Sequence, residues 1–273
     1  MQSTGDAVAA GAQSIDRAAT LLLLVGRAGP SGARLSQLVE QCDLSKPTVR
    51  RMLLALVRAG LLDQDPDTRR YYLGPELYVL GTLASARFGI HPMSLRSLVR
   101  LSQETGDTAF LSVPRDVYSI CVHREEGSYP IRIHALHAGD RHPLGVGAGS
   151  LALLSALPDH EVEEVLAANA EVLAERYPHH PPHVLRALVQ ETRGMGYALN
   201  PGLLLPDSWA VGVPVVASDG RPIGALSIAA IESRLGKARQ KEIASLLKKE
   251  ARWIETRLGK VGSAARHLRT KGK

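Results

Sequence analysis

Cysteine and long apolar runs are scarce in this sequence. Their scarcity argues against a disulfide-rich protein and against a membrane-spanning protein. Its 273 residues include two cysteines, Cys42 and Cys121, each within an apolar pattern. We therefore expect reduced core thiols and not a disulfide framework or a zinc knuckle. The apolar run at residues 20–25 is far shorter than the ~20 residues of a membrane span, and no signal-peptide pattern precedes it. These absences predict a cytoplasmic globular protein.

Positive charge is present but unevenly distributed. The formal net charge is +6, yet residues 1–85 hold nine Lys and Arg against eight Asp and Glu, whereas residues 232–273 hold thirteen against four. Any DNA contact near the N-terminus must therefore depend on individually placed arginines and not on a globally basic domain. We interpret the basic C-terminal end as a solvated helix face followed by a flexible tail.

Residues 35–73 have the pattern of a winged helix-turn-helix: a helix, a tight turn, a second helix and a short hairpin. The Ser45 hydroxyl is placed to cap the second helix, Pro47 fits its first turn, and Gly60 ends it. Apolar residues at three- and four-residue spacing predict one buried face of this helix. They are Val49, Met52, Leu53, Leu56 and Val57.

The opposite face of the second helix is polar and basic at its N-terminal end, where a recognition helix contacts base edges and phosphates. The candidate DNA-binding residues there are Ser45, Lys46, Thr48, Arg50 and Arg51. Arg69 and Arg70 lie in the candidate wing, where they would contact phosphates. Charged helix residues usually form only a solvated face, so the wing is what strengthens the prediction of double-stranded DNA as a partner.

The remaining pattern divides the chain into an ordered series of units. Residues 1–13 are expected to be a disordered arm, and residues 14–74 the winged helix-turn-helix, beginning with a helix capped by Ser14. A linker helix is expected within 75–90, from Pro75 to about Phe88, with apolar residues that suit a dimer. Residues 91–258 form a second domain, and residues 259–273 a basic flexible tail.

The pattern of the second domain predicts an α+β fold, in which helices cover an antiparallel sheet. Strand-like runs lie at 108–113, 118–123, 131–136, 196–199, 208–216 and 223–230. Helical patterns lie at 92–105, 151–157, 159–173, 181–193 and 237–258.

Other signals are weaker, and each has an ordinary interpretation. The alternating glycines of residues 145–149 resemble a dinucleotide-binding loop, but no parallel strand-helix-strand unit surrounds them. His179, His180 and His183 lie in a proline-rich stretch and are better read as a solvated loop than as metal ligands. We expect neither a metal nor a cofactor.

Arg132 and His134 alternate on one face of the predicted 131–136 strand. They are candidates for contact with an anionic ligand or a partner subunit, and a solvated sheet face explains them equally well.

Four stretches together resemble the IclR family of bacterial transcription regulators. They are QSIDRA at 13–18, LSKPTVRRML at 44–53, YLGP at 72–75 and GYAL at 196–199. The resemblance runs from Gln13 to Leu258 with the spacing between blocks kept. It implies a winged helix-turn-helix, a dimerising linker helix and a GAF-like domain that binds a small effector, commonly a carboxylic acid. It also implies a homodimer or homotetramer that represses or activates catabolic genes.

The resemblance also indicates an effector site. It places the effector against Gly147, Ala148 and Gly149, where amides at a helix start attract a carboxylate. Ser227 matches a polar pocket position, and Trp209 either lines the pocket or fills the core.

Several positions depart from the family pattern. Asn200 stands where aspartate is common, Ala210 where cysteine is common, and Ala229 where a hydroxyl residue is often found. Residues 201–205 replace an acidic run with Pro-Gly-Leu-Leu-Leu. Fewer polar anchors favour a more apolar or aromatic acid.

Two other function classes remain open at this point. An enzyme acting on a small acid would need a nucleophile or an acid-base pair in the pocket, and Asn200 and Ala210 remove reactive side chains from two of the positions. A sensor that acts through protein partners without DNA is the other alternative. We therefore expect a regulator and not an enzyme.

Overall fold

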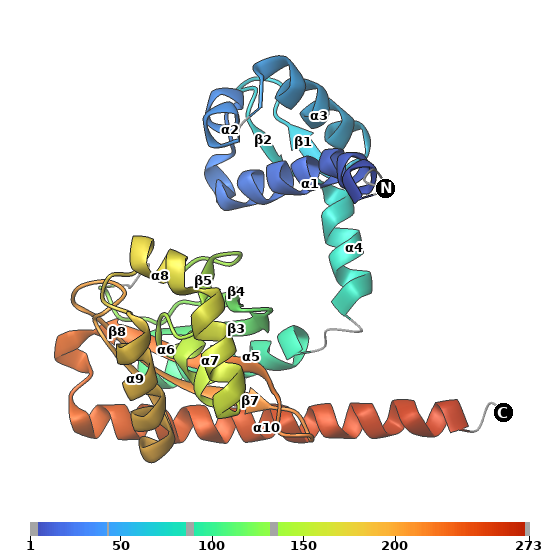
Figure 1. Cartoon of the computed structure of the whole chain (residues 1–273). Helices are drawn as coiled ribbons and strands as arrows, with labels where there is room; N and C mark the ends of the chain where they lie inside the picture. The colour runs from blue at the N-terminus through green and yellow to red at the C-terminus, as the bar shows by residue number, and fades with distance from the viewer. Residues whose placement is uncertain (1–4, 43, 86–89, 132–135, 271–273) are drawn as a thin grey trace. The chain divides into compact units, whose positions relative to one another are not determined.

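The computed structural model, drawn in Figure 1, describes residues 5–42, 44–85, 90–131 and 136–270. The chain divides into two compact units, with the boundary between residues 87 and 88. Within the described ranges, no helix is both long and apolar enough to cross a lipid bilayer.

The N-terminal unit is a winged helix-turn-helix, as the sequence predicts. Its elements are α1 (Gly5–Arg27), the 3-10 turn η1 (Gly29–Ser31), α2 (Leu35–Gln41), α3 (Lys46–Arg58), β1 (Leu62–Gln64), β2 (Tyr71–Leu73) and α4 (Pro75–Ser85). The strands β1 and β2 pair antiparallel. The core holds the apolar face of α3 against α1 and the hairpin, with Leu21, Val49, Leu53 and Leu62 fully buried.

Both ends of the chain are more helical than the sequence predicts. Helix α1 begins at Gly5, so the disordered arm of residues 1–13 and the helix start at Ser14 are wrong for the described part of that stretch. Alanine, the best helix former, makes up much of residues 7–12 and outweighs the one glycine there. Likewise α10 continues to Thr270 across most of the predicted tail 259–273. Residues 1–4 and 271–273 lie outside the described residues.

The C-terminal unit is built on a six-stranded antiparallel sheet in the order β5-β4-β3-β8-β7-β6. The strands are β3 (Thr108–Arg115), β4 (Tyr118–Glu125), β5 (Arg141–Pro143), β6 (Ala198–Pro201), β7 (Ser208–Val216) and β8 (Pro222–Ile231). The helices are α5 (Ile90–Thr105), α6 (Ala148–Ser155), α7 (Asp159–Ala168), α8 (Ala170–Arg176), α9 (Pro182–Met195), η2 (Glu232–Arg234) and α10 (Lys237–Thr270).

Three other predicted elements differ most from those observed. The predicted strand 131–136 falls largely on residues 132–135, outside the described residues, and the strand that pairs with β4 is β5. The predicted helix 159–173 is two helices, because Asn169 is buried and its side-chain amide donates to the Val117 carbonyl at 2.7 Å. The linker helix α4 ends at Ser85 in the described range, and residues 86–89 lie outside it.

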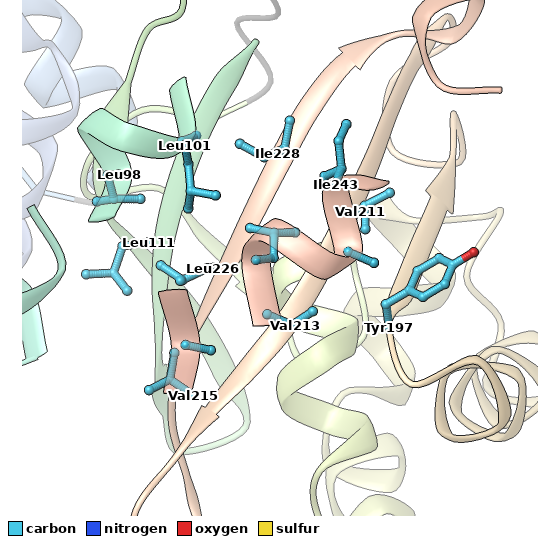
Figure 2. Close-up of a cluster of buried hydrophobic side chains, with 14 of the residues drawn as sticks. Leu98, Leu101, Leu111, Tyr197, Val211, Val213, Val215, Leu226, Ile228 and Ile243 are labelled. Carbon is cyan, nitrogen blue, oxygen red and sulfur yellow. The ribbon is translucent and has the colours of Figure 1, made fainter. Parts of the chain in front are cut away.

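Alternation along the strands separates the two faces of the sheet. Valines of β7 and Leu226 and Ile228 of β8 pack against Leu98 and Leu101 of α5 and against Ile243 of α10, as Figure 2 shows. The opposite face is covered by α6, all of whose residues are buried. Gly212 of β7 allows this approach, since a Cβ atom there would lie 2.6 Å from the Ala148 carbonyl oxygen. The first turn of α6 is therefore held directly against the sheet.

Candidate nucleic-acid interface and ligand cavity

The N-terminal end of α3 presents a basic surface. Val49 and Leu53 are fully buried, while Lys46, Arg50 and Arg51 on the other side of the helix are exposed. Pro47 occupies the first turn as predicted. The helix thus uses its apolar side for the core and leaves its cationic side chains accessible to an anionic partner.

Ser45 precedes α3 but does not cap it as the sequence predicts. Its hydroxyl makes no hydrogen bond to the first amides of the helix. Instead, its Oγ lies 2.9 Å from Oγ1 of Thr48, in a hydroxyl pair at the same end of α3. Both hydroxyls therefore belong to the polar surface around the basic side chains.

The two arginines of the wing have different environments. The wing turn is fixed by Asp65, whose carboxylate accepts from the Thr68 amide at 2.6 Å. Arg69 is exposed, and its backbone has a φ of 59°. Nη1 of Arg70 donates to the carbonyls of Ser31 at 2.7 Å and Gly32 at 3.1 Å. Arg70 therefore anchors the wing to the turn η1, while Arg69 points its charge outward.

The C-terminal unit contains a cavity between the sheet and the start of α6. Its lining includes Phe110, Ser112, Ser119, Cys121, Leu136, His142, Val146, Gly147, Ala148, Gly149, Ser150, Asn200, Leu204, Leu205, Ser208, Ala210, Ser227 and Ala229. The cavity volume is about 30 Å³, enough to hold water, for which a cavity of roughly 10–15 Å³ is needed. A larger ligand requires side chains of the lining to move.

The first turn of α6 brings backbone and hydroxyl groups together. A Cβ atom at Gly149 would lie 3.2 Å from Oγ of Ser227 and 3.5 Å from Oγ of Ser112, so glycine keeps the helix close to both hydroxyls. Ser150 has a structural role, because its hydroxyl accepts from the Gly145 amide at 3.1 Å and donates to the Pro143 carbonyl at 3.0 Å. The amides of this turn and the two serines form an arrangement suited to an anion.

The predicted effector residues are brought together except for one. Gly147, Ala148, Gly149, Asn200, Ala210 and Ser227 all line the cavity. Trp209 does not line the cavity and is wrong as a predicted effector residue. It fills the core, because it packs with the hydrophobic cluster on the α5 and α10 face of the sheet. Neighbouring residues of a strand point to opposite faces. Since Ala210 faces the cavity, Trp209 does not.

Asn200 holds the loop that follows it. Its Oδ1 accepts from the Leu203 amide at 3.2 Å, and Leu204 and Leu205 of the same loop line the cavity. The leucine side chains of this loop thus supply an apolar wall.

The sequence interpretation missed several cavity residues. Phe110 and Ser112 lie two residues apart on β3, and the alternation of that predicted strand carried the signal for them. His142 comes from the unpredicted strand β5, and its Nδ1 lies 3.0 Å from the hydroxyl of Tyr177. Burial lowers the pKa of His142. It raises the pKa of the Cys121 thiol to about 12, so this thiol stays neutral.

The histidine-rich stretch is not a solvated loop throughout. His179 and His183 are exposed, but His180 is 2% exposed, and burial lowers its pKa to about 4. In the ranges that the structure describes, no three side chains of the metal-binding types gather around one point. Residues 145–149 join an antiparallel sheet to α6, so the dinucleotide-loop alternative lacks its parallel framework. Arg132 and His134 lie outside the described residues.

Two family models match the chain. Residues 14–66 match the IclR helix-turn-helix domain, and residues 84–256 match the bacterial transcriptional regulator IclR C-terminal domain. Together they cover both structural units.

Individual relatives agree with these models. The glycerol operon regulatory protein of Streptomyces coelicolor is 29% identical over 237 residues, covering 82% of this chain and 86% of that protein. An IclR transcriptional regulator from Alicyclobacillus acidocaldarius aligns with a TM-score of 0.76 at 27% identity, covering 89% of this chain and 98% of that one. An IclR homologue from Microbacterium hydrocarbonoxydans, complexed with 4-hydroxybenzoate, shares the fold with a TM-score of 0.73 at 21% identity, over 89% and 98% of the two chains.

Proposed function

This chain belongs to the IclR family of bacterial transcriptional regulators, and we propose that it binds operator DNA through α3 and the wing under the control of a small carboxylic acid. The relatives are regulators and not enzymes. The observation that carries the proposal is the division of α3 into a buried apolar side and an exposed basic end.

For the DNA contacts, Lys46, Thr48, Arg50 and Arg51 enter the major groove, and Arg69 contacts phosphate from the wing. A good bidentate base contact contributes about 1–3 kcal/mol of discrimination. Phosphate contacts add affinity that falls with salt and does not depend on sequence. Arg70 acts indirectly, because its guanidinium holds the wing on the turn η1.

For the ligand, the cavity supports an acid with an apolar body. Amides of Gly147, Ala148 and Gly149 and the Ser227 hydroxyl meet the acid group, and apolar side chains meet the rest. An aromatic acid such as 4-hydroxybenzoate, the ligand in the Microbacterium structure, is a suitable probe. It would enter by displacing Leu204 and Leu205, since the cavity of about 30 Å³ is too small for it.

For the coupling between ligand and DNA, we propose a homo-oligomer joined through α4. The helix exposes Tyr78 at 79% and Leu83 at 70%, apolar surface that a second copy would cover. A dimer also fits DNA half-sites related by two-fold symmetry. The acid controls DNA binding if it binds one arrangement of the dimer more tightly than the other. Catabolic genes for such acids are the expected targets.

The test removes two positive charges from α3 and, in a control, two from the other unit. Arg50→Ala with Arg51→Ala should abolish preference for the operator over unrelated DNA while leaving acid binding intact. The control, Arg115→Ala with Arg176→Ala, changes net charge equally at two exposed arginines of the C-terminal unit and should keep specific binding.

Electrophoretic mobility shifts with excess competitor DNA measure the preference, and calorimetry measures acid binding. Equal operator binding by the two double variants would overturn the assignment of α3. Transcriptional control that survives the α3 variant would favour the alternative of a sensor acting through protein partners.

A further inference from the structure

His142 is an unassigned titratable side chain in the ligand cavity. Among the described residues that line this cavity, the two that titrate are His142 and Cys121. Cys121 lies too deep in the apolar interior to ionise near neutral pH, because burial raises its pKa to about 12. Of these lining side chains, His142 is therefore the one able to place a positive charge against a carboxylate.

The position of His142 follows from strand pairing. It lies opposite Ser119 in the register of β5 and β4, and directly opposed residues of neighbouring strands share a face. Ser119 also lines the cavity. The next residue, Pro143, accepts a hydrogen bond from Ser150 in the first turn of α6 at 3.0 Å. The strand that carries His142 is thereby tied to the helix start whose amides meet the acid.

A hydrogen bond to Tyr177 orients the imidazole ring of His142. Nδ1 lies 3.0 Å from the Tyr177 hydroxyl. The Tyr177 ring in turn meets His180 edge to face, with centroids 6.2 Å apart. When the phenol donates to Nδ1, Nε2 carries the proton of the neutral ring and can donate to a ligand oxygen. When the ring is protonated, both nitrogens donate. Nε2 then makes a charge-assisted hydrogen bond to the same oxygen.

Burial favours the neutral form of His142 in the absence of an anion. Burial lowers its pKa, and Asp140 on the approach to β5 raises it by a smaller amount. Behind it, burial raises the pKa of Tyr177 and lowers that of His180 to about 4, so neither carries charge at neutral pH. The guanidinium of Arg141, next to it on β5, is exposed and stacks on the Tyr118 ring at 4.1 Å. A carboxylate in the cavity then favours the imidazolium form.

We propose that His142 recognises the acid group of the effector and takes up one proton when the acid binds. This inference rests on the proposed function, because it requires a carboxylate in the same cavity. The acid is expected to bind more tightly as the pH falls, by up to about tenfold per pH unit while the free protein is neutral at His142 and the complex is charged. A neutral amide of the same shape should show no such dependence.

The test compares acids and amides on three full-length proteins. Acetate, benzoate and 4-hydroxybenzoate, each beside its amide, are titrated by calorimetry between pH 5.5 and 8 in two buffers of different ionisation enthalpy. The difference between buffers gives the number of protons taken up. His142→Gln removes the titrating group while keeping a donor. His91→Gln is the matched control, because His91 is also a histidine whose pKa burial lowers, and it does not line the cavity.

Each outcome decides a separate question. The inference predicts uptake of about one proton by the wild type and by His91→Gln, and a pH-independent, weaker affinity for His142→Gln. Acid binding with no proton uptake, or equal pH dependence in His142→Gln, would overturn the role of His142 and leave the proposed function standing. Failure of every acid to bind the folded wild type would instead overturn the carboxylic ligand itself, and the inference with it.

Discussion

Replacing Gly212 by alanine should destabilise the C-terminal unit and weaken acid binding together, because β7 passes directly beneath the first turn of α6. A Cβ atom there would lie 2.6 Å from the Ala148 carbonyl oxygen and 3.0 Å from the Gly149 amide nitrogen. Both neighbours are backbone atoms, so no side chain can rotate away. The helix start must move by roughly 0.8 Å to restore an ordinary contact.

The size of the effect follows from this displacement. Inserting one carbon into a packed interior costs about 1–3 kcal/mol. For a unit of this length, each kcal/mol lowers the unfolding midpoint by about 2–4 °C, so we expect a decrease of roughly 5 °C. Because the same displacement moves the amides that we propose bind the acid, the affinity for the acid should fall as well.

Thermal unfolding followed by circular dichroism, with and without a bound acid, measures both effects. Gly194→Ala is the matched control, because nothing lies within 4 Å of a Cβ atom at that helical position of α9. Alanine there should stabilise the protein by about 0.5–1 kcal/mol, since glycine is unfavourable within a helix. An unchanged midpoint and unchanged acid affinity in Gly212→Ala would refute the contact between β7 and α6.

Three further substitutions test how burial sets the energetic weight of charged side chains. The pKa of His180 is lowered to about 4 in the folded protein, so the unfolded chain binds its proton first and stability should fall, by up to about 3 kcal/mol, as the pH drops from about 6.5 to 4. In urea titrations across pH, His180→Gln should lose this dependence and His179→Gln should keep it. Asp107→Ala removes the buried partner of Arg234 and should cost about 1–3 kcal/mol in urea unfolding. Glu161→Ala breaks an exposed ion pair and should cost less than about 1 kcal/mol; equal costs would contradict the importance of burial.

The sequence is sufficient to predict those parts of the fold whose signals are local. The apolar spacing in α3, Pro47 in its first turn and the polar turn between β1 and β2 each depend on a few neighbouring residues, and all are observed. The bounds of β7, Ser208–Val216, agree with prediction because its nine residues carry a long apolar pattern. The same alternation also contained the information that Trp209 and Ala210 cannot face the same cavity.

The remaining features depend on tertiary contacts that no short pattern encodes. Strand β5 has three residues, Arg141–Pro143, and it is a strand only because β4 pairs with it. No local sequence pattern therefore predicts His142 as a cavity residue. His180 lies in a stretch rich in proline that favours a loop, yet it packs into the interior beside Tyr177. The extra turns of α1 reflect alanine content that outweighs isolated glycines, whereas the extension of α10 to Thr270 has two alanines against two glycines and no such explanation.

We propose that one chain couples sequence-specific DNA binding to occupancy of the cavity by an acid. The most direct measurement selects fragments of genomic DNA on the purified full-length protein and then titrates the best fragment by fluorescence anisotropy, against salt and against an acid shown by calorimetry to bind. We expect a specific complex whose affinity falls steeply with salt and changes when the acid is added. A selection that yields no preferred sequence, or an operator affinity that the bound acid leaves unchanged, would contradict it.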